Sequence, residues 1–405
     1  MKRWLGLAFL SALALGGGLL LLAGKNLIGC FYNLLDWNLY LYYSIATILV
    51  IGGTGGLIAG LNFTAKSVLT GLAQESENTS DIIWKQRRLS NGPSITAIGG
   101  GTGLSVLLAG LKRYTSNLTA IVTVMDDGGS SGRLREEMDI LPPGDIRNCI
   151  IALSDDESLM SKVFQHRFQS GGELCGHSLG NLFIAGMEEI TGGFDRSIEE
   201  TSKLLNIRGQ VLPATLANTD LVATLSTGDR VTGESSITNN SGAIEKVELA
   251  DKAPPHPEAI AAIRNAEYIV LGPGSLYTSL IPNLLVEDIA KEIERSTARK
   301  FFVINIMTET GETDSFTAFD HVKAIDKYVD FECFNWAVIN DGKVGDELIT
   351  QYSKEGSTLV KSDIPEPNKY GVGVLKEDLV QTVRLEGKPT IKHDSHKLAE
   401  LIISH

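Results

Sequence analysis

Two long runs of apolar residues without a charge stand near the start of the chain. Residues 4–24 form the first run, and residues 37–65 form the second and longer run. Each is long enough for a helix that crosses the hydrocarbon core of a membrane, which takes roughly 20 residues. The pattern therefore predicts a transmembrane helical hairpin over residues 1–65.

Basic residues flank the outer ends of these two runs, at positions 2, 3, 66, 85, 87 and 88. By the positive-inside rule, both ends of the hairpin then lie in the cytoplasm. An alternative reads residues 1–14 as a signal peptide cleaved near Ala12-Leu13-Ala14, with the second run stopping transfer. In either case, the polar residues 66–93 predict a linker. Residues 94–405 predict a cytoplasmic domain at the inner face of the cytoplasmic membrane.

From residue 94 onward, β-prone apolar runs alternate with segments of helical periodicity. Residues 94–98 and 118–127 predict two strands on either side of a helix, and residues 267–271, 300–307 and 334–340 predict three more buried strands. This alternation is typical of a Rossmann-like, doubly wound α/β fold with a mostly parallel sheet.

Two further features complete the expected fold. Residues 221–228 and 229–237 are short β-prone runs that predict a β-hairpin added to the main sheet, and residues 396–405 predict a terminal helix. Whether the stretch from Asp341 onward joins the sheet or covers it is left open.

One glycine-rich phrase occurs twice in nearly the same letters. Residues 50–60 read VIGGTGGLIAG and residues 98–110 read IGGGTGLSVLLAG. The first copy lies inside the second apolar run, where small residues allow close packing of helices and lipid offers a phosphate no charged partner. The second copy connects a predicted strand to a predicted helix, so its backbone N–H groups and the helix N-terminus favour a phosphate group.

The second copy fits neither of the standard nucleotide motifs. It lacks the GxxxxGK[ST] pattern of a Walker loop. It also lacks the third glycine of GxGxxG, although Asp126 follows Gly101 at a spacing near that of a ribose-binding acid. NAD is therefore not expected as a cofactor.

Further polar loops follow the predicted strands. The MDDGGSSGRLR stretch at residues 125–135 combines acids, serines, glycines and arginines, and LANTDL at residues 216–221 adds another acid. Asp127 and Asp220 could hold a divalent cation such as Mg²⁺. In PPGDIRNC, Asp145 is expected to cap a helix.

The GHSLG stretch matches the GxSxG nucleophile elbow of α/β-hydrolases at Ser178. That motif needs a buried strand directly before the serine, and QSGGELC is no such strand. The sequence therefore favours Ser178 as a helix N-cap or first-turn residue, with Asn181 as a side chain that contacts a ligand. In the GPGSLYTS stretch, the ring of Tyr277 is expected to stack on a base or sugar.

Composition narrows the range of partners. The net charge of −13 argues against binding to nucleic acid, because proteins that bind its phosphate backbone carry a basic face. The four cysteines (Cys30, Cys149, Cys175 and Cys333) lie far apart without metal-ligand spacing, which predicts buried free thiols in a reducing compartment.

Six motifs together resemble the gluconeogenesis factor family. They are GGGTG, DDGGSSGRLR, PPGDIRNC, GHSLGNL, LANTDL and GPGSLYTS, in this order, and the resemblance covers roughly residues 93–400. The YvcK-like members of this family bind uridine-diphosphate sugars and affect carbon metabolism and cell shape. The family is related to 2-phospho-L-lactate transferase. The predicted membrane hairpin lies outside the resemblance.

The resemblance implies a nucleotide-sugar site. It places the nucleotide phosphates against the first glycine loop, and it places the diphosphate and sugar against the second. The implied binding residues are Gly100, Gly101, Thr102, Gly103, Asp127, Ser130, Asn181, Asn218, Gly272, Gly274, Ser275 and Tyr277.

Two functions remain open at this stage. The first is a membrane-tethered regulator that binds a UDP-sugar such as UDP-N-acetylglucosamine and controls unknown protein partners in carbon metabolism or wall synthesis. The second is a phospholactate-type transferase that uses a guanosine nucleotide and a divalent metal. No residue stands out as a catalytic base, since His177 is the one histidine inside a motif. The sequence favours the regulator, and it leaves open whether the protein forms homo-oligomers.

Overall fold

In a computed structural model of the chain, the structure describes residues 2–23, 39–72, 79–154, 159–240, 242–366, 368–385 and 388–405. The chain divides into two compact units, Met1–Arg87 and Arg88–His405. Each unit is described by itself below, under the names unit 1 and unit 2.

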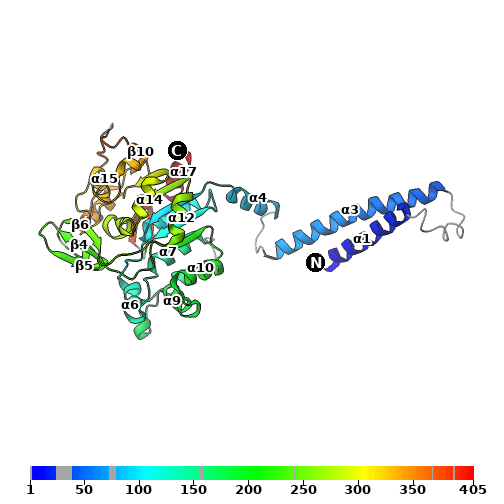
Figure 1. Cartoon of the computed structure of the whole chain (residues 1–405), viewed down its shortest axis with the longest axis horizontal. Helices are drawn as coiled ribbons and strands as arrows, with labels where there is room; N and C mark the ends of the chain where they lie inside the picture. Colours follow the sequence, from blue (N-terminus) through cyan, green and yellow to red (C-terminus); the bar gives the residue numbers. More distant parts are fainter. Residues whose placement is uncertain are drawn as a thin grey trace. The chain divides into compact units, whose positions relative to one another are not determined.

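Unit 1 contains two long helices that lie side by side, α1 (Lys2–Ala23) and α3 (Leu39–Leu72) (Figure 1). The glycine phrase of α3 forms their contact. A Cβ atom added at Gly53 would lie 2.6 Å from the backbone nitrogen of Leu15, and one at Gly60 would lie 3.0 Å from the Cβ of Ala8. Gly56 faces Ser11 in the same way. The prediction that this copy of the phrase packs helices is confirmed.

The hydropathy of these helices agrees only in part with two membrane spans. Within the described residues, Tyr43–Phe63 is long and apolar enough to cross a membrane, and Gly6–Leu21 is a shorter apolar helix. Insertion into a membrane stays a prediction.

Parts of the predicted linker, residues 66–93, are helical. Helix α3 continues to Leu72, and residues Thr79–Ser90 form helix α4. At its end, Leu89 is buried, and its carbonyl accepts hydrogen bonds from the N–H groups of Gly92 and Ser116. Unit 2 therefore begins several residues before the predicted boundary at residue 94.

The core of unit 2 is a seven-stranded sheet with the order β10-β9-β8-β7-β1-β2-β3, in which every pair of neighbours is parallel. The strands are β1 (Ile95–Gly99), β2 (Leu118–Val122), β3 (Gln210–Pro213), β7 (Tyr268–Leu271), β8 (Arg299–Val303), β9 (Trp336–Asn340) and β10 (Gly373–Glu377). The doubly wound α/β prediction is confirmed. The chain builds outward from β1 to β3 and then returns to β7 on the other side of β1. The topological switch point, where ligands bind in such sheets, therefore lies between β1 and β7.

Helices cover both faces of this sheet. One face carries α5 (Gly101–Leu111), α7 (Gly144–Leu153), α9 (Leu179–Thr191), α10 (Phe194–Leu204) and α17 (Ser395–Ser404). The other face carries α12 (Pro257–Asn265), α13 (Ile281–Leu285), α14 (Ile289–Arg295) and α15 (Ala318–Ile325). Strand side chains alternate between the two faces: Phe301 and Val303 pack on the first, whereas Phe302 packs on the second. The strands are apolar on both sides, as expected for a buried parallel sheet.

The predicted hairpin exists but does not extend the main sheet. Strands β4 (Leu221–Leu225) and β5 (Arg230–Thr232) pair antiparallel, and the other edge of β4 pairs with β6 (Ile244–Leu249). These three strands form a separate sheet. The prediction was wrong on this point because β6 occupies the edge of β4.

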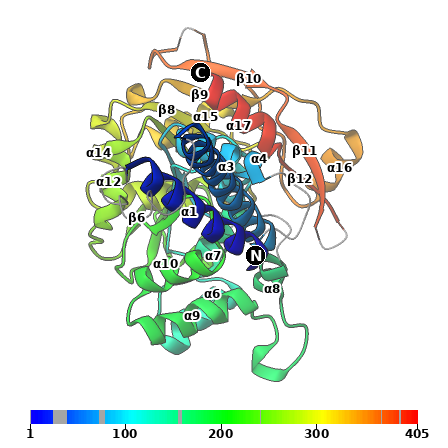
Figure 2. The same cartoon turned by 90° about the vertical axis from the view of Figure 1, so that its right-hand side faces the viewer.

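The stretch from Asp341 onward both joins the main sheet and adds elements outside it. Strand β10 joins the main sheet next to β9, whereas β11 (Val380–Leu385) and β12 (Lys388–His393) form a separate hairpin. This hairpin lies beside α16 (Asp346–Lys354) (Figure 2). Helix α17 ends the chain as predicted.

The cysteines agree only in part with the prediction of buried thiols. Cys149 is buried and Cys333 is half-buried, but Cys175 is exposed, contrary to prediction. Cys30 lies outside the described residues.

Candidate functional site: a pocket between two glycine loops

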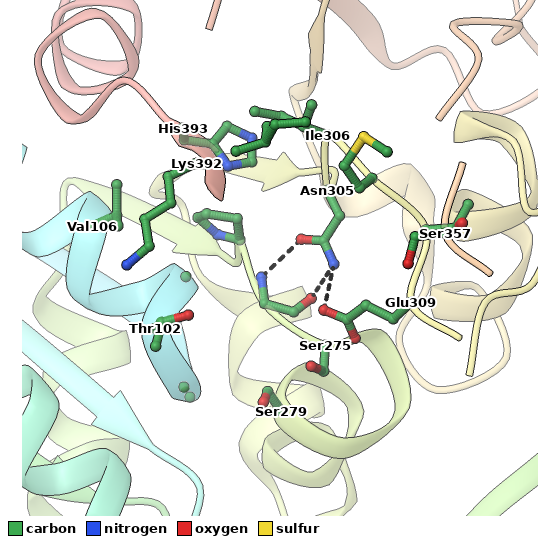
Figure 3. Close-up of a pocket in the computed structure, with 18 of the residues that line it drawn as sticks. Thr102, Val106, Ser275, Ser279, Asn305, Ile306, Glu309, Ser357, Lys392 and His393 are labelled. Atoms are coloured by element: carbon green, nitrogen blue, oxygen red, sulfur yellow. Dashed lines mark hydrogen bonds between the residues drawn. The ribbon is translucent and has the colours of Figure 1, made fainter. Parts of the chain in front are cut away.

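A cavity of about 260 Å³ lies at the C-terminal ends of β1 and β7. Six of the predicted binding residues line it: Gly100, Gly101, Thr102 and Gly103 from the loop after β1, and Gly274 and Ser275 from the loop after β7. The two loops are far apart in the chain, and the switch point brings them together (Figure 3). They face each other across one pocket.

Steric contacts explain why glycine is needed in these loops. A Cβ atom at Gly103 would lie 2.7 Å from the carbonyl carbon of Pro273, and one at Gly100 would lie 2.6 Å from a carboxylate oxygen of Asp145. Gly101 and Gly272 have left-handed φ angles of +62° and +87°, which glycine adopts without strain. Gly272 shapes the turn of the second loop, but it does not line the cavity.

Asn305 fixes the second loop. Its Oδ1 accepts a hydrogen bond of 3.1 Å from the N–H of Gly274, and its Nδ2 donates one of 2.9 Å to the carbonyl of Gly274 (Figure 3). Asn305 lies just after β8, so it also stands at the C-terminal edge of the sheet. Asn305 is not among the predicted binding residues, although a polar residue inside the apolar run KFFVINIM was an available signal.

Lys392 brings a positive charge to the pocket. It comes from β12, and its side chain extends toward Thr102 in the first glycine loop (Figure 3). Burial lowers the pKa of its ammonium group, and no ion pair holds it within the part of the chain that the structure describes. An unpaired cation beside the N-terminus of α5 favours an anionic ligand. No local signal in the sequence marks Lys392, because it lies near the C-terminus, far along the chain from the loop it faces.

Several carboxylic acids of unit 2 have raised pKa values, and one of them, Asp145, lies next to the first glycine loop. Asp145 accepts a hydrogen bond from the N–H of Gly101, and burial together with the charge of Asp126 raises the pKa of Asp145 to about 7. Burial and neighbouring acids likewise raise the pKa of Glu234, in α11 (Glu234–Thr238), to about 8, and that of Glu309 to about 7.

The prediction that Asp145 caps a helix was wrong. The N-cap of α7 is Pro143. The carboxylate of Asp145 instead ties α7 to the glycine loop, through the N–H of Gly101.

The two predicted metal ligands have other partners. Oδ1 of Asp127 accepts a 2.7 Å hydrogen bond from the N–H of Ser235, and Asp220 forms a 2.8 Å ion pair with Arg135. Oδ1 of Asn218 also accepts a 2.8 Å hydrogen bond from Nε of Arg135. Within the described residues, no group of three or more His, Cys, Asp or Glu side chains has the arrangement of a metal site.

Ser130 and Asn181 belong to a buried network and do not line the cavity. Nδ2 of Asn181 donates to Oγ of Ser130 at 3.1 Å, and Ser130 in turn contacts Nδ1 of His177 at 3.0 Å. Ser178 accepts a 3.0 Å hydrogen bond from the N–H of Asn181, which confirms it as the N-cap of α9. Oδ1 of Asn181 accepts a 2.8 Å hydrogen bond from Nη1 of Arg147. The network joins α6 (Gly129–Met138) to α9.

Tyr277 does not present its ring to a ligand. The residue is only 2% exposed, and its ring meets Phe316 edge to face at 6.3 Å between centroids. Its N–H donates to Glu312 at 3.2 Å. The prediction of a stacking platform was wrong because the loop continues into a buried helical turn, Leu276–Leu280, that faces the core.

Comparison with known proteins places this fold and pocket in a class. The model of the family "2-phospho-L-lactate transferase CofD" matches residues 95–380. A crystal structure of a protein from Bacillus halodurans superposes with a TM-score of 0.74 and 46% identity, covering 77% of this chain and 100% of that one. The class is therefore a CofD-type α/β protein whose glycine loops meet at the switch point.

Two curated relatives define the family more closely. The gluconeogenesis factor of Bacillus subtilis is 47% identical over 312 residues, which are 77% of this chain and 97% of that protein. A relative from Nostoc sp. is 41% identical over 428 residues, covering 100% of this chain and 90% of its own. The chain belongs to the gluconeogenesis factor family.

Proposed function

We propose that unit 2 binds the diphosphate of a nucleotide sugar in the pocket between the two glycine loops, and that it acts as a regulator of carbon metabolism and cell-wall synthesis. The observation that carries the proposal is the convergence of Lys392 and the loop that opens α5 on one cavity at the switch point. Backbone N–H groups at a helix start and one cation suit a diphosphate, because a diphosphate offers oxygens to both.

The size of the cavity supports a diphosphate rather than a whole nucleotide sugar inside it. Sites for complete small ligands typically span about 300–1,000 Å³, whereas this cavity has about 260 Å³. The nucleoside and the sugar of a UDP-sugar such as UDP-N-acetylglucosamine would then extend from the cavity on either side.

Calorimetric titration of Arg88–His405 tests the proposal. The Bacillus halodurans relative corresponds to 77% of this chain over its whole length, which supports the use of unit 2 without the N-terminal helices. We expect saturable binding of UDP-N-acetylglucosamine, with or without Mg²⁺, and no turnover. Binding that is absent at millimolar ligand would refute the assignment.

A second candidate function is a phospholactate-type transferase with a guanosine nucleotide donor. The match to the transferase family model favours it, as does the group of acids formed by Asp145, beside the first glycine loop, and its neighbours Asp126 and Glu234. Mg²⁺ usually binds one or two carboxylates together with substrate phosphates, so acids in this position fit a metal that arrives with a nucleotide. In the same calorimeter, Mg²⁺-dependent preference for GTP or GDP over the UDP-sugar would favour the transferase.

Tethering to the cytoplasmic face of the membrane is the second part of the proposal. The apolar stretch Tyr43–Phe63 and the close packing of α1 against α3 support a membrane hairpin. We expect the full chain to stay in the membrane pellet after carbonate extraction, whereas Arg88–His405 stays in the supernatant. A full chain that carbonate releases would contradict the tether.

A further inference from the structure

A second and larger cleft lies along the free edge of the main sheet. Its volume is about 540 Å³, and the consecutive residues 209–213 of the edge strand and its approach line it. Helix α10 forms one wall and the start of α12 forms the other. These helices belong to opposite faces of the sheet. The two layers therefore overhang the edge where an eighth strand would lie.

Among the described residues, β3 is the edge strand of the main sheet, so the backbone groups on its outer side face this cleft without a strand partner. The N–H of Ala214 donates to Val122 in β2, so in the alternation of an extended strand the N–H and C=O of Val211 point away from β2 and into the cleft. Pro213 also faces outward, at a position where its missing N–H removes no ladder bond.

The chain already uses the next part of this edge for an extended segment. Thr215 pairs antiparallel with Pro255, and the N–H of His256 donates to the carbonyl of Ala214 at 2.9 Å. This pairing stops where the cleft begins. The cleft thus continues a position in which an extended segment is already accommodated.

Buried polar atoms in the cleft walls lack partners. Nδ1 of His256 and Oγ of Ser202 have no hydrogen-bond partner among the described residues, and His256 is only 7% exposed. Buried polar groups are normally satisfied, so an occupant with polar groups would complete the site.

The charged side chains that line the cleft indicate which kind of binding partner fits it. Asp195 and Glu258 line the cleft, and neither forms an ion pair in the described parts of the chain. The one lysine of the lining, Lys203, is already paired with Glu199 at 2.7 Å. A second copy of this chain would bring the same acids to the same edge, which disfavours it, since like charges repel across an interface.

We propose that this edge cleft binds an extended, basic segment of a partner protein by strand addition to β3. Main-chain hydrogen bonds to Val211 would supply affinity, and basic side chains beside Asp195 and Glu258 would supply selectivity. The residues 209–213 span about 13 Å at roughly 3.3 Å per residue, which is enough for a short extended segment of similar length. The proposal does not depend on what the pocket beside Lys392 binds.

The test uses a fluorescein-labelled hexapeptide, Lys-Val-Lys-Val-Lys-Val, and the unit Arg88–His405. Fluorescence anisotropy measures binding, and hydrogen–deuterium exchange measures protection of residues 209–213. We expect salt-sensitive binding and slower exchange at the Val211 amide. Asp195→Lys combined with Glu258→Lys should weaken binding at least about tenfold, as loss of charge complementarity predicts, whereas the matched reversal of Asp229 and Glu347, outside the cleft lining, should leave it unchanged.

A peptide N-methylated on alternate residues checks the main-chain pairing, because it keeps the charge but loses the donors on one edge. Equal binding of this peptide, or of Glu-Val-Glu-Val-Glu-Val, would overturn the proposal, as would unchanged exchange at residues 209–213. Sedimentation equilibrium tests the alternative occupant of the cleft, a second copy of this chain. A dimer that dissociates in the Asp195→Lys, Glu258→Lys variant would show that a second copy takes the cleft and would also overturn it.

Discussion

Replacement of Gly103 by alanine tests how closely the two glycine loops must approach. The added Cβ would lie 2.7 Å from the carbonyl carbon of Pro273 and 3.0 Å from the nitrogen of Gly274. Carbon atoms in contact prefer about 3.5–4.0 Å, so the start of α5 and the second loop would have to separate by about 1 Å. The second loop cannot simply move back, because Asn305 holds Gly274 by two hydrogen bonds.

The size of the effect follows from this geometry. Overpacking in a well-packed region costs about 1–3 kcal/mol, and a clash of backbone against backbone belongs at the upper end. We therefore expect Gly103→Ala to lower the free energy of unfolding by about 3 kcal/mol. With a urea m-value of about 3 kcal/mol/M, the midpoint shifts down by about 1 M. Widening of the pocket should also weaken nucleotide-sugar binding at least tenfold, about 1.4 kcal/mol.

Urea unfolding and calorimetric titration of Arg88–His405 measure the two effects separately. Gly186→Ala is the matched control, since Gly186 lies inside α9 with no atom within 4 Å of an added Cβ. That control should stabilise the protein by about 0.5–1 kcal/mol and leave binding unchanged. A Gly103→Ala variant with wild-type midpoint and wild-type affinity would refute the idea that contact between the loops shapes the pocket.

Three further predictions concern single side chains. Lys392→Met should weaken binding of UDP-N-acetylglucosamine by about 1.5–3 kcal/mol, as expected for a charge-assisted hydrogen bond, while Lys388→Met, at the exposed start of the same strand, should not change the calorimetric affinity. Without divalent cations, thermal stability should fall as pH rises from about 5 to 8, because folding keeps a proton on Glu234 that the unfolded chain releases above its ordinary pKa of 4.5. Glu234→Gln should reduce the loss of stability between about pH 5 and pH 8 by about 1–2 kcal/mol. This is less than the full pKa shift would give, because Glu234 is partly exposed to solvent. Tyr277→Ala should cost about 3–5 kcal/mol in urea unfolding, as for a large core residue, rather than act on binding alone.

The sequence predicted the elements that depend on local patterns. A strand, a glycine loop and a helix over residues 95–111 follow from periodicity and glycine placement, and the N-cap role of Ser178 follows from the absence of a strand before it. The packing role of Gly53 and Gly56 follows from their place in an apolar run. In each case, the deciding information lies in the immediate neighbourhood of the residue along the chain.

The sequence did not predict what depends on long-range contact. The position of Lys392 requires knowing that the β11–β12 hairpin folds back over the loop at Thr102. Tyr277 had the local pattern of a binding loop, but tertiary packing turned its ring into the core. Asp145 had the sequence pattern of a helix cap, but its carboxylate instead accepts a hydrogen bond from the N–H of Gly101. A residue pattern defines which groups are available, and the fold decides which partner each one finds.

The source of the pocket's positive charge bears on the choice between regulator and transferase. The transferase family model matches residues 95–380 and so includes both glycine loops and Asn305. Lys392 lies beyond that region, on a hairpin that closes one side of the cavity. In the proposed function, the shared part of the chain would supply the backbone groups for a diphosphate, and the C-terminal part would supply the cation. Because this cation lies outside the matched region, the match to the transferase model accounts for the fold of the pocket but not for its charge. The ligand preference of Lys392 variants therefore bears more directly on function than the family match does.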